Sequence, residues 1–171
     1  PKLKVGVEIT HFNYLSQQPG GLTDAQFKVD AYSSLRQRNW FEVKWNIAAI
    51  NLDYTFSEKS RLNIKTFAMY GERNSIGFNQ TPNIADSINA GSQLYNNRRV
   101  DVDQYNNFGL ETRFITDYKL GKSKHSFSAG ARYFVGNTYR FQNGKGDAGL
   151  KYNLNVSNPY PTDLDFLTTN L

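Results

Sequence analysis

The side chains in this sequence that are best suited to binding a charged ligand are arginines near its polar loops. A guanidinium group keeps its charge at physiological pH and pairs with a carboxylate through two parallel hydrogen bonds. We favour Arg73 and Arg99, because residues at strand ends are better positioned than residues at loop tips. The alternatives are ordinary loop cations or contacts with anionic lipopolysaccharide. The full set of candidate ligand-binding residues is Arg36, Arg38, Arg73, Arg98, Arg99 and Arg140.

Residues suited to catalysis or metal binding form no recognisable site. The two histidines, His11 and His125, belong to opposite ends of the expected strands, so they cannot share a metal. Asp101 and Asp103 alternate like Ca²⁺ ligands, but no glycine and terminal glutamate of an EF-hand follow. The segment 144–146 lacks the remaining residues of a phosphate-binding loop, and the chain has no cysteine. The sequence therefore predicts no enzyme, no covalently bound cofactor and no metal site.

The composition is polar, yet it is rich in aromatic residues. Hydrophobic residues make up 39% and aromatic residues 15% of the chain, and the mean hydropathy is −0.63. The walls of membrane-spanning β-barrels carry many aromatic side chains, because these line both membrane interfaces. An aromatic-rich soluble β-protein is the alternative. The net charge of +5 is spread singly, with no run longer than Arg98-Arg99, which disfavours a nucleic-acid partner.

Period-2 alternation of apolar and polar residues dominates the chain and predicts an all-β fold. The five expected strands span about residues 2–14, 40–56, 61–76, 105–118 and 125–141, and the expected long loops span 15–39, 77–104 and 142–171. Thr23 or Asp24 can cap a short helix in the first loop. The apolar parity of the second strand changes near Ala48-Ala49, which predicts a β-bulge there.

Long and short connections alternate strictly along the expected strands. Outer-membrane barrels join their strands in this way, with short periplasmic turns and long extracellular loops. The expected strands also exceed the roughly 9–11 residues that cross a bilayer. We therefore predict an antiparallel up-and-down meander of about five long strands that is part of a transmembrane β-barrel. Since five strands cannot close a barrel of eight or more, we expect the chain to belong to a longer polypeptide or to pair with other chains.

Several stretches of the chain carry a family resemblance. They are the run from Gln17 to Phe27, the run Arg38-Asn39-Trp40-Phe41, the segment 52–57 and the run from Arg98 to Arg113. In order and spacing they resemble the TonB-dependent outer-membrane receptors, close to the ferric-citrate branch. The resemblance spans roughly residues 4–143. It identifies the whole chain, residues 1–171, as a partial receptor barrel.

The resemblance implies a place in the cell outer membrane and the uptake of ferric citrate or a similar ferric siderophore. The ferric chelate would be the transported ligand, and the candidate arginines would contact it near the outer mouth. The implied partners are outer-membrane lipid, lipopolysaccharide and the TonB complex, the last through a region absent from this chain. Glu111, Arg113 and Arg132 would line the lumen as structural charges. Competing hypotheses are a soluble β-sandwich that binds glycans through Trp40 and Trp45, and a general porin or barrel adhesin.

Overall fold

The chain folds into one antiparallel sheet in which each strand pairs with the next along the sequence. The computed structural model describes residues 2–81, 83–157 and 167–170. Its strands are β1 (Leu3–Gln17), β2 (Trp40–Ser57), β3 (Ser60–Gly77), β4 (Arg99–Leu120), β5 (Ser123–Lys145) and β6 (Leu167–Asn170), with one helix, α1 (Asp24–Val29). The predicted all-β meander is therefore confirmed.

The five long strands overlap the five predicted ones and extend beyond them. Residues 99–104, expected in a loop, form the start of β4, and β5 continues to Lys145. The short strand β6 lies within the segment expected to be a loop and pairs with residues 137–140 of β5. The expected short helix is present, and Thr23 caps it, since its side chain accepts a hydrogen bond from the Gln26 backbone.

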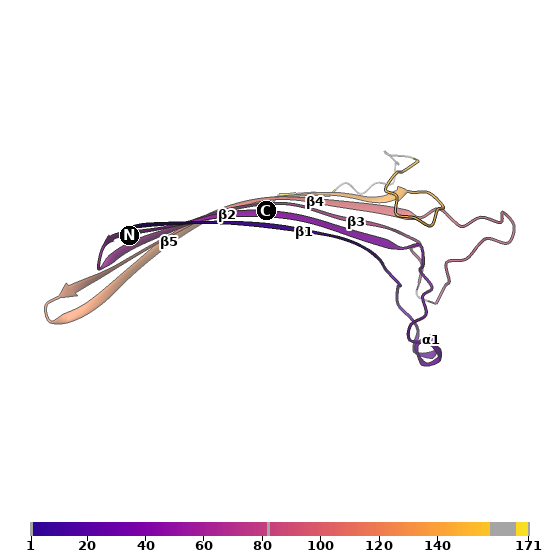
Figure 1. The fold of residues 1–171 in the computed structure, drawn as a ribbon, viewed down its shortest axis with the longest axis horizontal. Helices are drawn as coiled ribbons and strands as arrows, with labels where there is room; N and C mark the ends of the chain where they lie inside the picture. Colours follow the sequence, from indigo (N-terminus) through magenta and orange to yellow (C-terminus); the bar gives the residue numbers. More distant parts are fainter. Residues whose placement is uncertain (1, 82, 158–166, 171) are drawn as a thin grey trace.

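Short and long connections gather at opposite ends of the sheet (Figure 1). The β2–β3 and β4–β5 turns lie at one end, which we call the turn end, whereas α1 and the long loops lie at the other, the loop end. Gly121 in the β4–β5 turn has a φ of 61°, a conformation that two-residue hairpin turns require and that glycine adopts without strain. Figure 1 shows the strands bent into a shallow arc, which gives the sheet a convex and a concave face.

The convex face carries a continuous apolar band over the turn-end half of the sheet. Cross-strand partners share a face, because side chains alternate along each strand. The apolar band consists of Leu3, Val5, Val7, Ile9, Ala48, Ile50, Leu52, Tyr54, Leu62, Ile64, Thr66, Ala68, Phe108, Leu110, Thr112, Phe114, Ala129, Ala131, Tyr133 and Val135. Much of it lies open: Val7 is 69% exposed and Ile9 79%.

The concave face at the same level is polar and charged. The row of cross-strand partners Asn51, Lys65, Glu111 and Arg132 crosses β2 to β5 there. In the next row, Asn63 donates a hydrogen bond of 2.8 Å to Asp53. The turn-end half of the sheet therefore has one apolar face and one hydrophilic face.

The predicted bulge near Ala48-Ala49 in β2 is absent. Ala48 pairs with Ile9 and Ala68, and Ala49 pairs with Glu8 and Phe67, so the ladder is continuous at this point. The register shifts lie elsewhere, between Thr55 and Ser57 and between Val100 and Val102. The bulge prediction was therefore wrong.

The change of parity in β2 instead marks the level at which apolar side chains move to the other face. Above this level Phe41, Val43 and Trp45 lie on the concave face, while Asn46 and Lys44 lie on the convex face. Phe41 and Trp45 therefore do not share a face with Ile50, as the bulge would have required.

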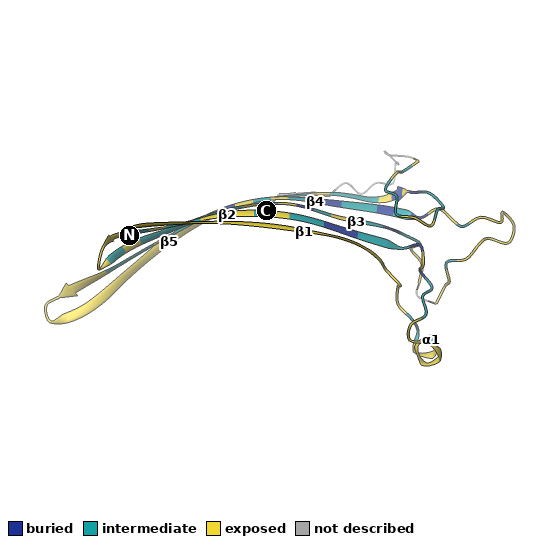
Figure 2. Cartoon of the chain, in the orientation of Figure 1, coloured by how far each residue is buried: buried dark blue, intermediate teal, exposed yellow. Residues whose placement is uncertain are grey.

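Burial is concentrated at the loop end, as Figure 2 shows. The buried apolar residues at this end include Val43, Ile76 and Val100. No helix in the described ranges is both long and apolar enough to cross a membrane. Because buried residues are concentrated at the loop end, side chains there are held in fixed positions.

Candidate functional site

Three neighbouring strands bring two of the candidate arginines together around one carboxylate on the concave face. Arg73 of β3, Asp103 of β4 and Arg140 of β5 are successive cross-strand partners. Asp103 accepts a hydrogen bond of 2.9 Å from Arg73 Nη2 and one of 3.0 Å from Arg140 Nε. We call Arg73, Asp103 and Arg140 the arginine cluster.

The arginine cluster keeps cationic surface available. The Asp103 side chain is only 4% exposed, whereas those of Arg73 and Arg140 are 48% and 36% exposed. Two guanidinium groups against one carboxylate leave a net charge of +1 at the cluster. Guanidinium donors that do not face Asp103 can bind a second carboxylate, since each guanidinium carries five N–H groups.

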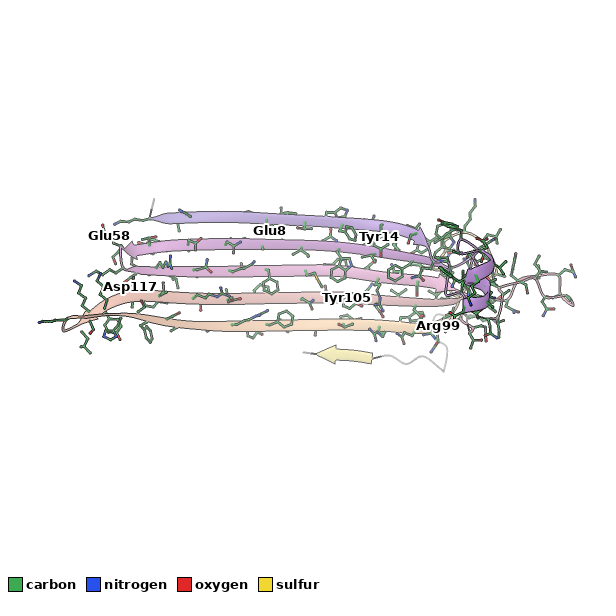
Figure 3. All side chains as sticks on the ribbon, turned by 90° about the horizontal axis from the view of Figure 1, so that it is seen from below. Glu8, Tyr14, Glu58, Arg99, Tyr105 and Asp117 are labelled. Atoms are coloured by element: carbon green, nitrogen blue, oxygen red, sulfur yellow. The ribbon has the colours of Figure 1, made fainter. Side chains whose placement is uncertain are left out.

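Aromatic side chains adjoin the arginine cluster on the same face. Tyr105 donates a hydrogen bond of 3.3 Å from its hydroxyl to Asp103, and its ring stacks on Trp45 with centroids 5.9 Å apart. Tyr14 packs against Phe41 at 6.1 Å. Figure 3, which views the sheet from its concave side, shows Tyr14 on β1 and Tyr105 on β4 at similar levels along the strands. Aromatic rings thus lie beside the cluster on the concave face.

Arg99 lies two rows of side chains closer to the loops, in a pocket of its own. Its Nε donates a hydrogen bond of 2.8 Å to Asp101, and its side chain is 32% exposed. The pocket has a volume of about 240 Å³ and is also lined by Gln18 and Asn39. Arg99 therefore has exposed donors near the concave face, although its nearest carboxylate is separate from Asp103.

Arg36 and Arg38 hold loops together instead of facing solvent. Both are buried, at 4% and 1% exposure. Arg36 donates to the carbonyl oxygens of Gln80 and Thr81 at 3.1 and 2.8 Å. Arg38 forms two hydrogen bonds to Asp86, of 2.7 and 2.6 Å. These contacts join the β1–β2 loop to the β3–β4 loop.

Arg98 fixes the segment after β5 in the same way. It is 1% exposed and donates to the carbonyl oxygens of Arg38 and Lys151 at 3.0 and 2.9 Å. It also pairs with the Asp147 carboxylate. Burial alone would raise the pKa of Asp147, but hydrogen bonds from Arg98, Asn153 and the Gly149 backbone outweigh it and lower that pKa.

The structure thus divides the six candidates into two groups. Arg73, Arg99 and Arg140 have exposed guanidinium groups near the concave face, and Arg73 and Arg140 share one carboxylate. The buried group comprises Arg36, Arg38 and Arg98. Sequence analysis missed the role of Asp103 and Tyr105, although their alternation with Asp101 in β4 places all three on one face and is a usable signal.

The charges expected to line a lumen lie together on the concave face. Arg113 pairs with Glu111 along β4, and Glu111 is the cross-strand partner of Arg132. The histidines lie apart: His11 hydrogen-bonds Asn46 at 2.8 Å, and His125 stacks on Tyr118 near the turn end. Within the described part of the chain, no three acidic, histidine or cysteine residues are grouped to hold a metal ion.

Comparison of the chain with protein-family models, curated proteins and solved structures gave no match. The geometry of the sheet and of the arginine cluster is therefore the basis for assigning a function.

Proposed function

We propose that this chain is part of the wall of an outer-membrane β-barrel receptor that takes up ferric citrate or a similar ferric siderophore with energy from TonB. The observation that carries the proposal is the opposite character of the two faces. Across β1 to β5, the convex face carries an exposed apolar band and the opposite, concave face carries charged residues. A barrel wall needs this arrangement, because lipid covers one face and water or protein the other.

The height of the apolar band supports a membrane-facing role. On β5 it continues through Phe127, so that apolar residues on this face span nine residues, Phe127 to Val135. At about 3.3 Å per residue they cover about 26 Å along the strand. A strand tilt of roughly 40° reduces this to about 20 Å, close to the roughly 25 Å band of known barrels.

Aromatic residues border the apolar band at both levels. Phe56 and Tyr118 are exposed near the turn end, and Tyr70 and Tyr139 are exposed on the convex face toward the loop end. Barrels carry such girdles where the acyl chains meet the headgroups. In the proposed orientation, the turns lie on the periplasmic side and the long loops, with the arginine cluster, on the outer side.

The ligand class follows from the exposed arginines. Arg73 and Arg140 keep donors free of Asp103 on the concave face, and Arg99 adds a third cation two rows closer to the loops. Such a group favours a ligand with several carboxylates, because each guanidinium can engage one of them. A ferric citrate complex is an anion of this kind, and the rings of Trp45 and Tyr105 lie next to the arginines.

The membrane part of the proposal is tested by the behaviour of the intact protein. We expect it to remain with the membrane fraction after a high-salt wash and to need detergent for extraction. Recovery in the aqueous fraction without detergent would contradict the barrel and would favour the soluble glycan-binding β-sandwich.

The ligand part is tested by ferric citrate binding. We expect the Arg73→Ala, Arg99→Ala double variant to lose at least tenfold in affinity, since each lost charge-assisted bond is worth roughly 1.5–3 kcal/mol. Arg61→Ala, on the concave face at the turn end, is the matched control and should bind normally. Unchanged affinity in the double variant would remove these arginines from the site. No ferric citrate binding by the intact wild-type protein would instead favour a porin or adhesin.

A further inference from the structure

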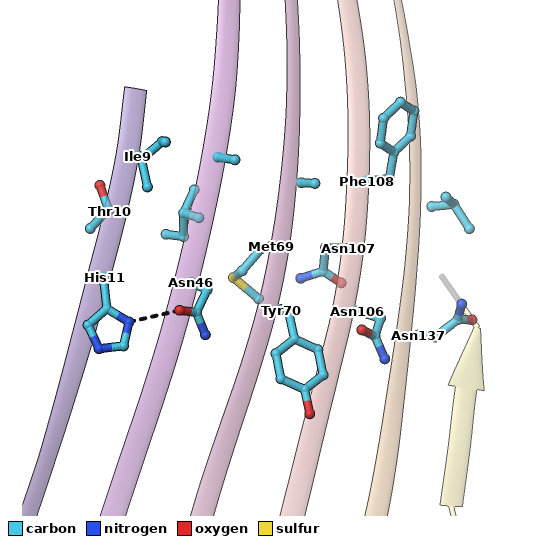
Figure 4. A pocket seen from close by; sticks show the side chains of 14 residues that line it. Ile9, Thr10, His11, Asn46, Met69, Tyr70, Asn106, Asn107, Phe108 and Asn137 are labelled. Carbon is cyan, nitrogen blue, oxygen red and sulfur yellow. Dashed lines mark hydrogen bonds between the residues drawn. The ribbon is translucent and has the colours of Figure 1, made fainter. Parts of the chain in front are cut away.

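A groove of about 520 Å³ crosses the convex face at the loop-end border of the apolar band. Figure 4 shows its lining side chains, which come from β1 to β5. Two adjacent rows of cross-strand partners on this face line it, together with Thr10, Ile47, Met69 and Asn107 of the row between them. The first row is apolar: Ile9, Ala48, Ala68, Phe108 and Val135. The second is polar: His11, Asn46, Tyr70, Asn106 and Asn137.

The hollow of the groove comes from two small residues between larger ones. Ala48 and Ala68 are neighbouring partners at the middle of the apolar row, with Ile9 on one side and Phe108 on the other. Ile9 and Phe108 are 79% and 43% exposed, so both stand out from the sheet. The two alanines therefore form the floor of a trough whose walls are apolar. Its shape and lining suit a hydrocarbon chain lying along the strands.

The polar row offers neutral hydrogen-bonding groups. The amides of Asn46, Asn106 and Asn137 each provide both donors and an acceptor. The His11 ring hydrogen-bonds the Asn46 carbonyl oxygen at 2.8 Å, which orients the Asn46 amide nitrogen away from the ring. No lysine, arginine, aspartate or glutamate is among the residues that line the groove.

The neutral lining of the groove favours a sugar headgroup over a phosphate headgroup. A phosphate carries a negative charge and only acceptor oxygens at neutral pH, so its sites are built from arginine or lysine. A sugar hydroxyl donates and accepts at once and matches a side-chain amide without any charge. The neutral row of amides next to an apolar trough therefore complements an amphiphile with a sugar head and a single chain seated on the alanines.

We infer that this groove binds a sugar-headed membrane amphiphile, with its chain over Ala48 and Ala68 and its hydroxyls on Asn46 and Asn106. The inference rests on the proposed membrane location, in which this border lies at the level of the lipid headgroups. It adds a second ligand site on the face opposite the arginine cluster.

The test compares two probes that share a chain and differ in the head. The intact protein, purified in lauryldimethylamine oxide, is titrated with dodecyl maltoside or with dodecylphosphocholine, and bound molecules are counted by native mass spectrometry. We expect tighter binding of dodecyl maltoside. The Asn46→Leu, Asn106→Leu double variant should lower its affinity about tenfold or more, because two neutral hydrogen bonds are removed. Ala48→Phe should also lower it by filling the trough.

Asn13→Leu is the matched control, because Asn13 lies on the same face of β1 outside the groove. Equal affinity for the two probes, or unchanged affinity in the double variant, would overturn the inference. Those outcomes would not contradict the proposed barrel if the protein still needs detergent for extraction. Recovery of the protein without detergent would instead overturn the proposed function itself.

Discussion

Arg38 and Asp86 form a doubly hydrogen-bonded ion pair in which each side chain is only 2% exposed. The bonds run from Nε to Oδ2 at 2.7 Å and from Nη2 to Oδ1 at 2.6 Å. Arg38 precedes β2, and Asp86 lies between β3 and β4. The Arg38 guanidinium also packs 4.2 Å from the Tyr95 ring and donates to the Ala148 carbonyl at 3.0 Å. One side chain thus holds three loop segments together.

The first prediction concerns this pair. Asp86→Ala leaves the Arg38 charge buried without its partner, which typically costs about 3–5 kcal/mol. We expect hydrogen exchange of residues 78–98 to become at least a hundredfold faster, while the strands at the turn end keep their protection. Glu58→Ala, in the exposed β2–β3 turn, should leave exchange in these loops unchanged. Equal protection in Asp86→Ala and the wild type would show that the pair does not hold the loops.

The second prediction concerns the charge balance of the arginine cluster. Asp103→Asn keeps the shape of the side chain but removes the carboxylate that Arg73 and Arg140 share. Because the local charge becomes more positive, we expect ferric citrate to bind about three- to tenfold more tightly at low ionic strength. The gain should shrink as salt is added.

Isothermal titration at two salt concentrations measures this effect. Asp53→Asn, on the concave face near the turn end, makes the same charge change away from the cluster and is the control. Weaker binding in Asp103→Asn would mean that Asp103 serves chiefly to orient the arginines.

The sequence predicted the meander because alternation is a local property of each strand. It could not distinguish a bulge at Ala48-Ala49 from a move of the apolar side chains of β2 to the other face, since both produce the same change of parity in one strand. The register of the neighbouring strands decides between them, because Ala48 pairs with Ile9 of β1 and Ala68 of β3 without a shift. The answer therefore depends on the register between neighbouring strands. The change of face does not extend to β3 to β5, whose concave face carries Arg73, Asp103 and Arg140 at these levels.

The relative placement of the arginines could be foreseen from the sequence where strands hold them, but not in the loops. Arg73 and Arg140 lie on one face because both are cross-strand partners of Asp103 in β4. The order of the strands and the alternation of side chains along each strand are enough to predict this placement. Arg38 and Asp86 are 48 residues apart, in segments without periodicity. No local pattern links them, so the burial of Arg38 could not be foreseen.

The third prediction is a pH dependence of the segment after β5. The pKa of Asp147 is lowered from its ordinary value of 3.8 in the folded protein. A lowered pKa contributes stability above the unfolded value, and that contribution is lost as the pH falls through the folded value. We therefore expect residues 146–157 to lose hydrogen-exchange protection below pH 3.8.

Asp147→Asn provides the comparison for this prediction. An asparagine cannot titrate, so the exchange of residues 146–157 in this variant should be less sensitive to pH across the same range. The same acid sensitivity in the variant and the wild type would assign the effect to other groups.

The fourth prediction tests which face meets lipid. Ile50 lies within the apolar band, and its neighbour Asn51 lies on the concave face. Ile50→Arg should destabilise the membrane-inserted protein by about 2–4 kcal/mol, the usual cost of arginine on the lipid face near the midplane. Asn51→Arg should have a much smaller effect, because its side chain faces the hydrophilic side. Urea unfolding in lipid vesicles measures both, and equal effects would contradict the assignment of the faces.

The fifth prediction concerns Gly109, over which an aromatic ring lies on the concave face. Gly109 of β4 is the cross-strand partner of Phe67 in β3. A Cβ atom at Gly109 would lie 2.3 Å from two carbons of the Phe67 ring, and that ring is 6.2 Å from the ring of Phe134 in β5. The absence of a side chain at Gly109 thus lets Phe67 reach across β4 toward Phe134.

Gly109→Ala should therefore destabilise the sheet by about 1–3 kcal/mol, because the Phe67 ring must leave its position. The reason is specific enough to be tested by a double-mutant cycle with Phe67→Ala. If the ring causes the clash, Gly109→Ala should cost much less in the Phe67→Ala background, and the two effects should not add. Additive changes in the free energy of unfolding, measured with urea, would mean that Gly109→Ala acts through the backbone conformation and not through a clash with the Phe67 ring.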